Sequence, residues 1–348
     1  MPFNTGWLFG PAAAGSTQPG FDDSQLQTVT LPHTVTPLSW RNWDPDSWQQ
    51  AWVYRKHFGT PAQASGMRVF LDVAAAMTSF TPVLNGQVLA GHVGGYLPFS
   101  AEITDQLSAS GNVLAISLDS HFNFDVPPDR PAPYDPRSID YWEPGGLYRD
   151  VQLRVVPQAY IFDVFAKPVN VLSADQRQVQ VQCTVDAAAV PSGAVTITAE
   201  LLDGTAVISS ASAPATISQT GQVTVTVTLS DLAGVTLWDI DNPKLYTVRA
   251  TLRVNGAPLH DYHVRTGFRA ASFTLDGFYL NGNRLKLFGL DRHQFFPFAG
   301  GAMSARVQRR DVEIMVQELN CNMVRCSHYP QSEAFYDAAD ELGLMVWE

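Results

Sequence analysis

The sequence predicts a multidomain protein in which two β-sandwiches precede the beginning of a parallel (β/α)8 barrel. Its 348 residues are too many for one ordinary domain and favour two or three. Apolar residues alternate at period two in many short segments up to about residue 271, as half-buried strands require. After that point apolar residues follow the helical period between short apolar segments, which is typical of a parallel α/β fold.

The composition narrows the class of protein. Hydrophobic residues make up 45% and charged residues 16% of the chain, as in a folded globular protein and unlike a disordered one. With 22 Lys and Arg against 33 Asp and Glu, the net charge is −11, which argues against nucleic acid or an anionic membrane as a partner. Acidity that serves solubility alone is the commoner explanation of such a charge.

The three cysteines, Cys183, Cys321 and Cys326, are too few and too far apart for a disulfide framework, and they lack the spacing of a metal site. Cys321 and Cys326 lie in an apolar segment, so we expect reduced thiols packed in a core. The first 20 residues show no signal-peptide pattern, and no apolar stretch approaches the ~20 residues of a membrane span. We therefore expect a soluble protein, cytoplasmic unless a periplasmic or secretory leader has been removed, and the compartment stays open.

Residues 1–157 are expected to form the first sandwich. Apolar residues alternate in the segments 67–73 and 114–118, and Asn85-Gly86 is a typical hairpin turn. Several such strands at regular spacing favour a sandwich.

Residues 158–271 are expected to form a smaller, immunoglobulin-like sandwich. Four alternating segments lie in this range, at 179–185, 195–201, 223–229 and 246–254. Their spacing suits such a domain, which takes roughly 100 residues. The range contains no group of catalytic side chains, so we interpret it as a spacer.

Residues 272–348 are expected to form an incomplete barrel, with strands over 284–288, 323–325 and 344–347. One helix is predicted after Ser304 and another from Ser332 to Gly343, because these residues suit helix ends. The apolar residues expected on the buried sides are Val307, Ile314, Met315 and Leu319 in the first helix and Phe335, Ala338, Ala339 and Leu342 in the second.

Three strands fall far short of a barrel, which takes about 250 residues. No helix follows the last predicted strand, so we expect these residues to be the N-terminal part of a longer protein. A small natural three-stranded unit is the alternative, but it would leave apolar strand edges bare.

In a parallel barrel the functional side chains lie at the carboxyl ends of the strands. The predicted strands end in 289–293, 325–330 and Glu348, which together bring two histidines, two arginines, a tyrosine and two carboxylates to one rim. Such a rim supplies donors and acceptors for the hydroxyls of a sugar. A single histidine there is more often structural, and Arg325 could simply pair with Asp291 or Glu348, so the interpretation depends on the convergence of all three ends.

The chain carries a dense motif over 322–347, which reads NMVRCSHYP, then FY, Asp340 and GLMVW. Further motifs precede it in order: LPH at 31–33, WVYR at 52–55, GHVGGY at 91–96, GGLYRDV at 145–151, GFR at 267–269 and GLDRH at 289–293. Together they resemble glycoside hydrolase family 2, the family of β-galactosidases, β-glucuronidases and related β-mannosidases, over essentially the whole chain.

The resemblance implies a galactose-binding-like jelly-roll domain, an immunoglobulin-like domain and a TIM barrel. It also implies an enzyme that hydrolyses terminal β-linked glycosides with retention, by one carboxylate that attacks the anomeric carbon and another, about 5–5.5 Å away, that protonates the leaving oxygen. In the family these glutamates follow strands four and seven, so both are expected beyond Glu348, and this chain alone is expected to be inactive. The resemblance implies no cofactor here, although some full-length galactosidases bind Mg²⁺ through ligands beyond this range.

The resemblance assigns supporting roles to residues of this chain. His293 and His328 resemble the histidines that hydrogen-bond the hydroxyls of the sugar, and Arg325 resembles the arginine that keeps the nucleophile ionised. Glu348 matches the acidic residue that closes strand three and supports the site, and it is not the acid/base. The other candidates at the rim are Asp291, where relatives often have Asn, Tyr329, and Asp140, a loop carboxylate that reaches the barrel mouth in some galactosidases but is more often simply exposed.

The triplet Arg292-His293-Gln294 resembles the β-galactosidase form of its motif more than the Lys-His-Glu-Asp form of glucuronidases, which favours β-galactosides. β-Glucuronidase or β-mannosidase specificity, a non-catalytic carbohydrate-binding protein, and a split enzyme completed by a second polypeptide stay open as alternatives. The expected partner is the carbohydrate substrate, with neither nucleic acid nor membrane, and the full-length form is compatible with a homo-oligomer.

Overall fold

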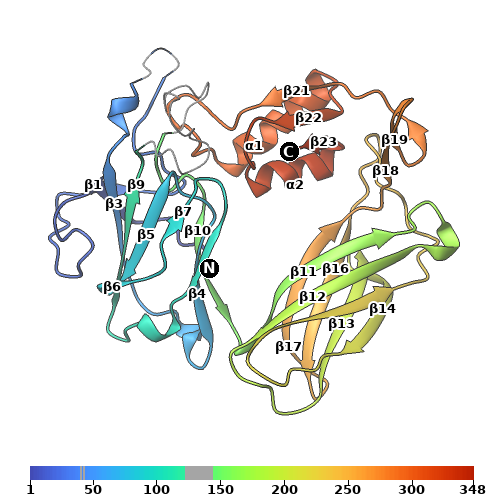
Figure 1. The fold of residues 1–348 in the computed structure, drawn as a ribbon, viewed down its shortest axis with the longest axis horizontal. Coiled ribbons are helices and arrows are strands. Elements are labelled where there is room, and N and C mark those ends of the chain that lie inside the picture. Colours follow the sequence, from blue (N-terminus) through green and yellow to red (C-terminus); the bar gives the residue numbers. More distant parts are fainter. Residues whose placement is uncertain (40, 42–43, 122–143) are drawn as a thin grey trace.

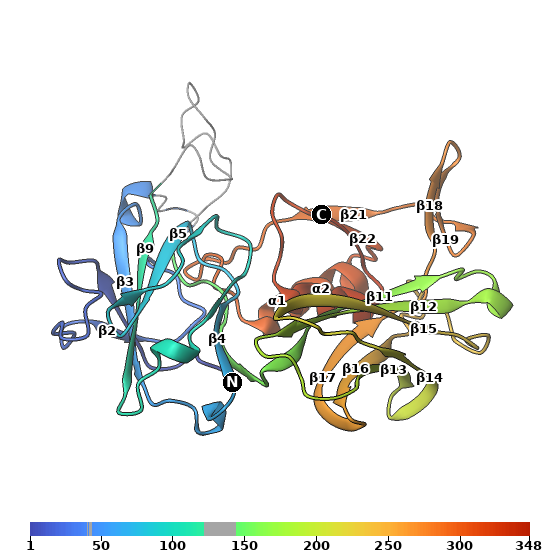
Figure 2. The ribbon, with the colours of Figure 1, turned by 60° about the horizontal axis from the view of Figure 1, so that its bottom comes forward.

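The computed structural model describes residues 1–39, 41, 44–121 and 144–348, which form two β-sandwiches and a small α/β unit (Figure 1). Figures 1 and 2 both place the helices of the α/β unit between the two sandwiches. No helix among the described residues is long and apolar enough to cross a membrane.

Sandwich 1 consists of an antiparallel sheet in the order β2-β1-β3-β9-β5-β6, with β7 beside β5, and a second antiparallel sheet in the order β10-β4-β8. Its strands are β1 (Trp7–Pro11), β2 (Gln27–Val29), β3 (Ala51–Phe58), β4 (Arg68–Val73), β5 (Ser79–Leu84), β6 (Gln87–Val88), β7 (His92–Val93), β8 (Phe99–Glu102), β9 (Asn112–Asp119) and β10 (Val151–Val156). Short 3-10 turns cover Pro45–Ser47, Ala62–Ala64 and Thr104–Gln106.

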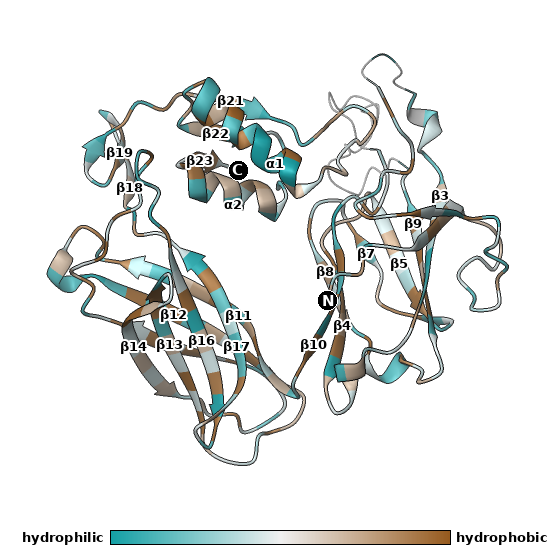
Figure 3. Cartoon of the chain, turned by 180° about the vertical axis from the view of Figure 1, so that it is seen from behind, coloured by the Kyte–Doolittle hydropathy of each residue, from teal (hydrophilic) through white to brown (hydrophobic). Residues whose placement is uncertain are grey.

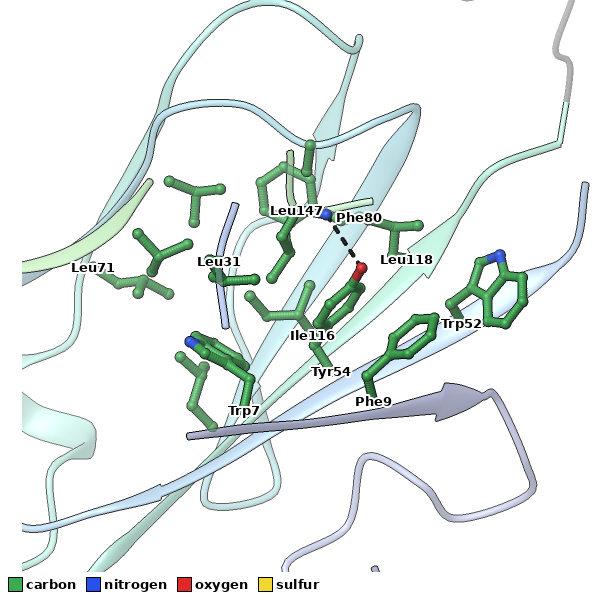
Figure 4. Close-up of a cluster of buried hydrophobic side chains, with 14 of the residues drawn as sticks. Trp7, Phe9, Leu31, Trp52, Tyr54, Leu71, Phe80, Ile116, Leu118 and Leu147 are labelled. Atoms are coloured by element: carbon green, nitrogen blue, oxygen red, sulfur yellow. Dashed lines mark hydrogen bonds between the residues drawn. The ribbon is translucent and has the colours of Figure 1, made fainter. Parts of the chain in front are cut away.

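One hydrophobic core lies between these two sheets (Figure 4). At 67–73 the predicted core-facing residues are confirmed, because Val69, Leu71 and Val73 of β4 are fully buried. The expectation of a half-buried strand is wrong there, because Arg68 and Phe70 on the other face are buried too, and Phe70 packs against Tyr160. The predicted hairpin is also present: Asn85 and Gly86 join β5 to β6 with φ of +53° and +82°, as a type I′ turn requires. In the centre of the core, the Tyr54 hydroxyl accepts a 3.4 Å hydrogen bond from the backbone N–H of Leu147.

Sandwich 2 consists of the sheets β11-β12-β15 and β14-β13-β16-β17, which share a second core. In β12 every second residue from Val179 to Val185 is fully buried, which confirms the predicted alternation, and Cys183 among them is a buried free thiol. Figure 3 shows the hydrophobic and hydrophilic residues alternating along strands of both sandwiches. The strands are β11 (Ala159–Val169), β12 (Gln178–Ala187), β13 (Val195–Asp203), β14 (Ala206–Pro214), β15 (Gly221–Leu229), β16 (Tyr246–Val254) and β17 (Ala257–Thr266), with a 3-10 turn at Ala174–Gln176.

The chain reaches the α/β unit through a small antiparallel sheet of β18 (Ala271–Thr274), β19 (Gly277–Leu280) and β20 (Asn283–Arg284). The predicted strand over 284–288 is therefore wrong, and the first parallel strand begins at Gly289. Asn322 explains the difference, because its side chain donates to Lys286 O and accepts from Phe288 N, at 3.0 and 2.9 Å. These backbone groups are thus bonded to a side chain and do not join a strand ladder.

The α/β unit has the parallel strands β21 (Gly289–Arg292), β22 (Met323–Cys326) and β23 (Met345–Trp347), in that spatial order. Two helical segments cover one face of this sheet: α1 (Ala305–Glu313), continued by a π-helical turn over Ile314–Glu318, and α2 (Glu333–Leu342). Ser304 and Ser332 occupy the N-cap positions as predicted, although neither side chain makes a capping hydrogen bond. The buried core of the unit includes Val312, Met315, Val324, Phe335, Ala338, Ala339 and Leu344, with the reduced thiols of Cys321 and Cys326.

Leu319 was expected on the buried side of the first helix, and this is wrong, because its side chain is 47% exposed. The π-helical turn that precedes Leu319 contains one more residue than an α-helical turn. The extra residue rotates Leu319 away from the face on which the α-helical period had placed it.

The α/β unit contacts both sandwiches. On sandwich 2, the indole N–H of Trp238 donates to Asp340 O at 2.8 Å, and Arg265 pairs with Asp337 and Glu341 of α2. On sandwich 1, the ring of Tyr96 stacks on that of Tyr329. The two sandwiches also contact each other, because Arg68 of β4 pairs with Asp186 of β12. Contacts with both sandwiches therefore determine where the ends of β21, β22 and β23 lie.

Candidate active site

The three parallel strands end side by side. Register pairs Arg292 with Cys326 and Arg325 with Trp347, so the segments that follow β21, β22 and β23 leave the sheet at one edge. Most of the side chains predicted for the rim come from these segments.

His293 and His328 are neighbours at this edge. Their ring centroids are 5.3 Å apart and the ring planes are nearly perpendicular, at 82°. His293 is half-buried and also stacks against Phe295, whereas His328 is exposed. Two imidazoles from different strands therefore face one space, where each offers a nitrogen donor or acceptor to a polyhydroxylated ligand.

Arg325 and Asp291 lie directly opposite each other on adjacent strands. The closest guanidinium and carboxylate atoms, Nη1 of Arg325 and Oδ1 of Asp291, are 3.6 Å apart, and the two side chains are 46% and 64% exposed. An exposed pair at this distance contributes little to stability. Arg325 therefore remains available to a second carboxylate, which is the role that the resemblance assigns to it.

The face of the sheet that the helices leave uncovered carries Asp291, Arg325 and Trp347 in one row across the three strands. A cavity of about 380 Å³ borders the same face and is lined largely by apolar side chains, including Met323 and Met345. The polar side chains at the strand ends thus lie on the same face of the sheet as an apolar cavity.

Glu348 is held by α2. Its Oε1 accepts a 2.6 Å hydrogen bond from the Tyr336 hydroxyl, which in turn accepts the backbone N–H of Gln331 at 2.8 Å. Burial, with a smaller contribution from Glu348, raises the pKa of Tyr336, so the phenol stays protonated and donates. The nearby Cys326 is equally unreactive, because burial first and the Glu348 carboxylate second raise the pKa of its thiol to about 11.

Arg292 does not reach the rim, which corrects the expectation that two arginines gather there. Successive residues of a strand point to opposite faces, so Asp291 faces the open side and Arg292 faces the helices. Arg292 is 6% exposed, donates to Asp311 at 2.6 and 3.0 Å and to Gln308 at 2.7 Å, and its guanidinium lies 4.2 Å above the ring of Phe335. It joins the first strand to both helices.

Gln294 is likewise buried and structural. Its side chain donates to Gly301 O at 3.2 Å and accepts the backbone N–H of Ser332 at 2.8 Å. Of the triplet that favoured β-galactosides, His293 alone faces the site, so Arg292 and Gln294 give no direct contact with which to select a sugar.

Tyr329 belongs to the support of the site, since it is 6% exposed. Its hydroxyl oxygen accepts the backbone N–H of Gln294 at 3.0 Å and lies 3.4 Å from Nδ1 of His293. Sequence reasoning did not single out the partner that stacks on it, Tyr96 of sandwich 1, or the nearby Arg149. Both lie in motifs that carried the family resemblance, and that was the available signal.

Asp140 lies outside the described residues, so the structure does not place it. Among the described residues, no group of three or more His, Cys, Asp and Glu side chains is arranged to hold a metal ion. No residue in the described ranges is therefore assigned as a metal ligand.

Comparison with known proteins gives the same family over two parts of the chain. The model described as "Glycosyl hydrolases family 2, TIM barrel domain" matches residues 273–348, and the model described as "Glycosyl hydrolases family 2" matches residues 159–269.

Among curated relatives, a β-galactosidase of Thermoanaerobacter pseudethanolicus is 32% identical over 352 residues, covering 100% of this chain and 46% of the relative. A protein named putative β-glucuronidase from Formosa agariphila is 27% identical over 99% of this chain and 40% of its own length. The chain thus spans about half the length of the curated relatives it matches.

Solved structures agree in fold. The crystal structure of a Bacteroides uniformis β-glucuronidase matches with a TM-score of 0.88 at 28% identity, over 100% of this chain and 41% of that one. A putative β-galactosidase from Bacteroides fragilis matches with a TM-score of 0.84 at 27% identity, over 100% of this chain and 52% of that one. The chain belongs to glycosyl hydrolase family 2.

Proposed function

We propose that the protein carrying this chain hydrolyses terminal β-linked glycosides, with β-galactosides as the preferred class. The observation that carries the proposal is the convergence of His293, His328 and Arg325 at one edge of three parallel strands. The names of the curated relatives support the reaction class, and the β-galactosidase at 32% identity supports the preference for galactosides. β-Glucuronides are the second candidate, favoured by the solved β-glucuronidase with a TM-score of 0.88.

The proposed architecture follows the family. Residues 1–157 form a jelly-roll domain, 158–271 an immunoglobulin-like domain, and 272–348 the first part of a TIM barrel. The two separate cores and the parallel order β21-β22-β23 support this division. In a barrel, ligands bind where the strands end, which is the edge that carries the candidate residues.

The proposed chemistry is retaining hydrolysis by two carboxylates. Neither carboxylate is assigned to a residue of this chain, and Glu348 serves as a supporting group through its bond to Tyr336. His293 and His328 bind the hydroxyls of the sugar, and their hydrogen bonds strengthen as charge develops on the ring in the transition state.

Arg325 has the second supporting role. It pairs loosely with Asp291 at 3.6 Å, so it can also contact a nucleophilic carboxylate without losing a buried partner. A guanidinium beside that carboxylate lowers its pKa and keeps it ionised for attack.

The test is an assay of the purified whole protein with matched aryl β-galactoside, β-glucuronide and β-mannoside substrates. Hydrolysis of the galactoside with the β-anomer as first product, detected by NMR, is the expected result. Faster turnover of the glucuronide or mannoside would reassign the sugar. Binding of a β-glycoside without turnover would show that the protein binds carbohydrate and does not hydrolyse it.

The same assay on residues 1–348 expressed alone is expected to show no turnover, because the proposed mechanism assigns neither carboxylate to them. Turnover that appears only when a second polypeptide is added would favour the split enzyme.

A further inference from the structure

We propose that sandwich 1 positions the candidate site, and that Tyr96 and Arg149 are positioning residues that hold Tyr329 and, through it, His293. The inference rests on the proposed function, since it gives His293 a place in sugar binding. It extends that function by making a β-sandwich outside the parallel strands a determinant of the geometry of the site.

The first contact is the stack of two tyrosine rings. Tyr96 lies between β7 and β8 of sandwich 1, and its ring is 4.6 Å from that of Tyr329 with the planes inclined by 8°. Parallel stacking with an offset is a preferred arrangement of two aromatic rings, so the contact favours this relative position. Tyr329 itself is 6% exposed, so its ring is fixed on the other side by the α/β unit.

The second contact is made by the guanidinium of Arg149, which bonds to both sides of the stack. Nη1 donates to Tyr96 O at 3.1 Å, and Nη2 donates to the carbonyl oxygen of Pro330, the residue after Tyr329. The group also lies 5.3 Å from the centre of the Tyr148 ring. One planar, permanently charged group therefore links the backbone beside each tyrosine.

The space between the two rings is closely packed. The cavity between Tyr96, Tyr148, Gln294 and Tyr329 measures about 10 Å³, which is the space of one water. Gly95, the residue before Tyr96, approaches so closely that a Cβ would lie 2.3 Å from Sδ of Met77. A cleft of about 590 Å³ also borders Tyr96, Arg149 and Pro330, so the junction is open at its edge. A displacement of Tyr96 toward Tyr329 is transmitted to that ring, because the space between them is filled.

Tyr329 passes the constraint to His293. Its hydroxyl oxygen accepts the backbone N–H of Gln294, the residue after His293, at 3.0 Å, and it lies 3.4 Å from Nδ1 of His293. These two contacts join Tyr329 to the backbone and to the histidine ring at the end of β21. The Tyr96–Tyr329 stack thus helps to set the place of the histidine.

The test uses the whole protein and an aryl β-galactoside. Tyr96→Leu and Arg149→Met are expected to lower kcat/KM by roughly tenfold or more, mainly through kcat, because misplacement of a hydrogen-bonding group weakens the transition state most. Tyr96→Phe keeps the stacked ring and is expected to stay within about twofold of the wild type. The matched control is Arg177→Met, which removes an arginine that also donates to backbone carbonyls, here within sandwich 2 and in a buried position.

A second readout does not require activity. In ¹⁵N-histidine NMR, with the His293 signals assigned by His293→Gln, the wild type and Tyr96→Phe are expected to give the same His293 ring signals, and Tyr96→Leu and Arg149→Met are expected to shift them. Wild-type kcat/KM and unchanged His293 signals in Tyr96→Leu and Arg149→Met would overturn the inference, as would an equal loss of kcat/KM in Arg177→Met. A wild type that hydrolyses no glycoside, with the His293 signals still dependent on Tyr96, would refute the proposed function and leave the positioning role standing.

Discussion

The rings of Tyr96 and Tyr329 lie face to face, 4.6 Å apart, across the junction between sandwich 1 and the α/β unit. Tyr329 is also within 3.4 Å of His293. A residue of the N-terminal sandwich is therefore two contacts away from a side chain proposed to bind the sugar. This continuity makes the sandwich part of the support of the site.

His328→Ala in the whole protein is expected to lower kcat/KM by about 100-fold, because it removes hydrogen bonds that strengthen in the transition state. The side chain is exposed, so the free energy of unfolding should change by less than about 0.5 kcal/mol. Steady-state kinetics measure the loss of kcat/KM, and urea unfolding measures the free energy of unfolding. His263→Ala, at an exposed position of sandwich 2, is the control, and a loss of stability without a loss of activity would assign His328 a structural role.

Arg292→Met is expected to lower the free energy of unfolding by about 2–3 kcal/mol, because it leaves the buried Gln308 without its donor and removes the partner of the partly exposed Asp311. Asp311 and Gln308 would then lose the donors that satisfy them. Arg310→Met on α1, the helix that carries Gln308 and Asp311, is the control. Its side chain is 53% exposed and pairs with Glu318, so a loss of about 0.5 kcal/mol or less is expected. Urea unfolding of both variants measures the difference, and equal effects would contradict the structural role of Arg292.

His33 should make the stability of sandwich 1 depend on pH. Burial lowers the pKa of its imidazole from 6.5 to about 4, while Nδ1 contacts the Tyr54 hydroxyl at 2.8 Å. Between these two values the unfolded chain binds a proton that the folded chain does not. The contribution of His33 to the free energy of unfolding is therefore fully present above pH 6.5, and it is lost as the pH falls from 6.5 toward 4.

Urea unfolding at pH 7 and pH 5 checks this expectation. The wild type should lose more stability between the two values than His33→Gln, which has no titrating ring. Equal losses in the two proteins would show that His33 does not titrate in this way.

Local patterns predicted most of the elements. The core-facing residues of β4, the alternation in β12, the Asn85-Gly86 turn, and the helix ends at Ser332 and Gly343 each depend on residues close together in sequence, and each was found where expected. Two local predictions failed for equally local reasons. The side chain of Asn322 occupies the backbone groups of the expected strand over 284–288, and the π-helical turn rotates Leu319 outward.

The candidate site was predictable only as far as strand ends determine it. Parallel strands bring His293, His328, Arg325 and Asp291 to one edge whatever surrounds them. The burial of Arg292 follows from strand alternation, a rule that was available from the sequence and was not applied to this residue. The Tyr96–Tyr329 stack depends on how two domains pack, and no periodicity in one chain encodes such a contact.

Gly343 ends α2 in close contact with the backbone of Ile240, which precedes β16 of sandwich 2, so replacing it should be unusually costly. Its φ is +78°, and a Cβ would lie 2.1 Å from the carbonyl oxygen of Ile240. Gly343→Ala therefore combines left-handed strain of about 1–2 kcal/mol with a clash against backbone that cannot rotate away, and we expect a total loss of about 3–4 kcal/mol.

Gly204→Ala is the matched control, because Gly204 has φ of +59° and no atom within 4 Å of the added Cβ, so only the strain of about 1–2 kcal/mol is expected. Urea unfolding compares the two variants. A Gly343→Ala loss no larger than that of Gly204→Ala would mean that α2 and the Ile240 loop can separate, and the close contact between sandwich 2 and the α/β unit would then be no constraint on the position of the strand ends.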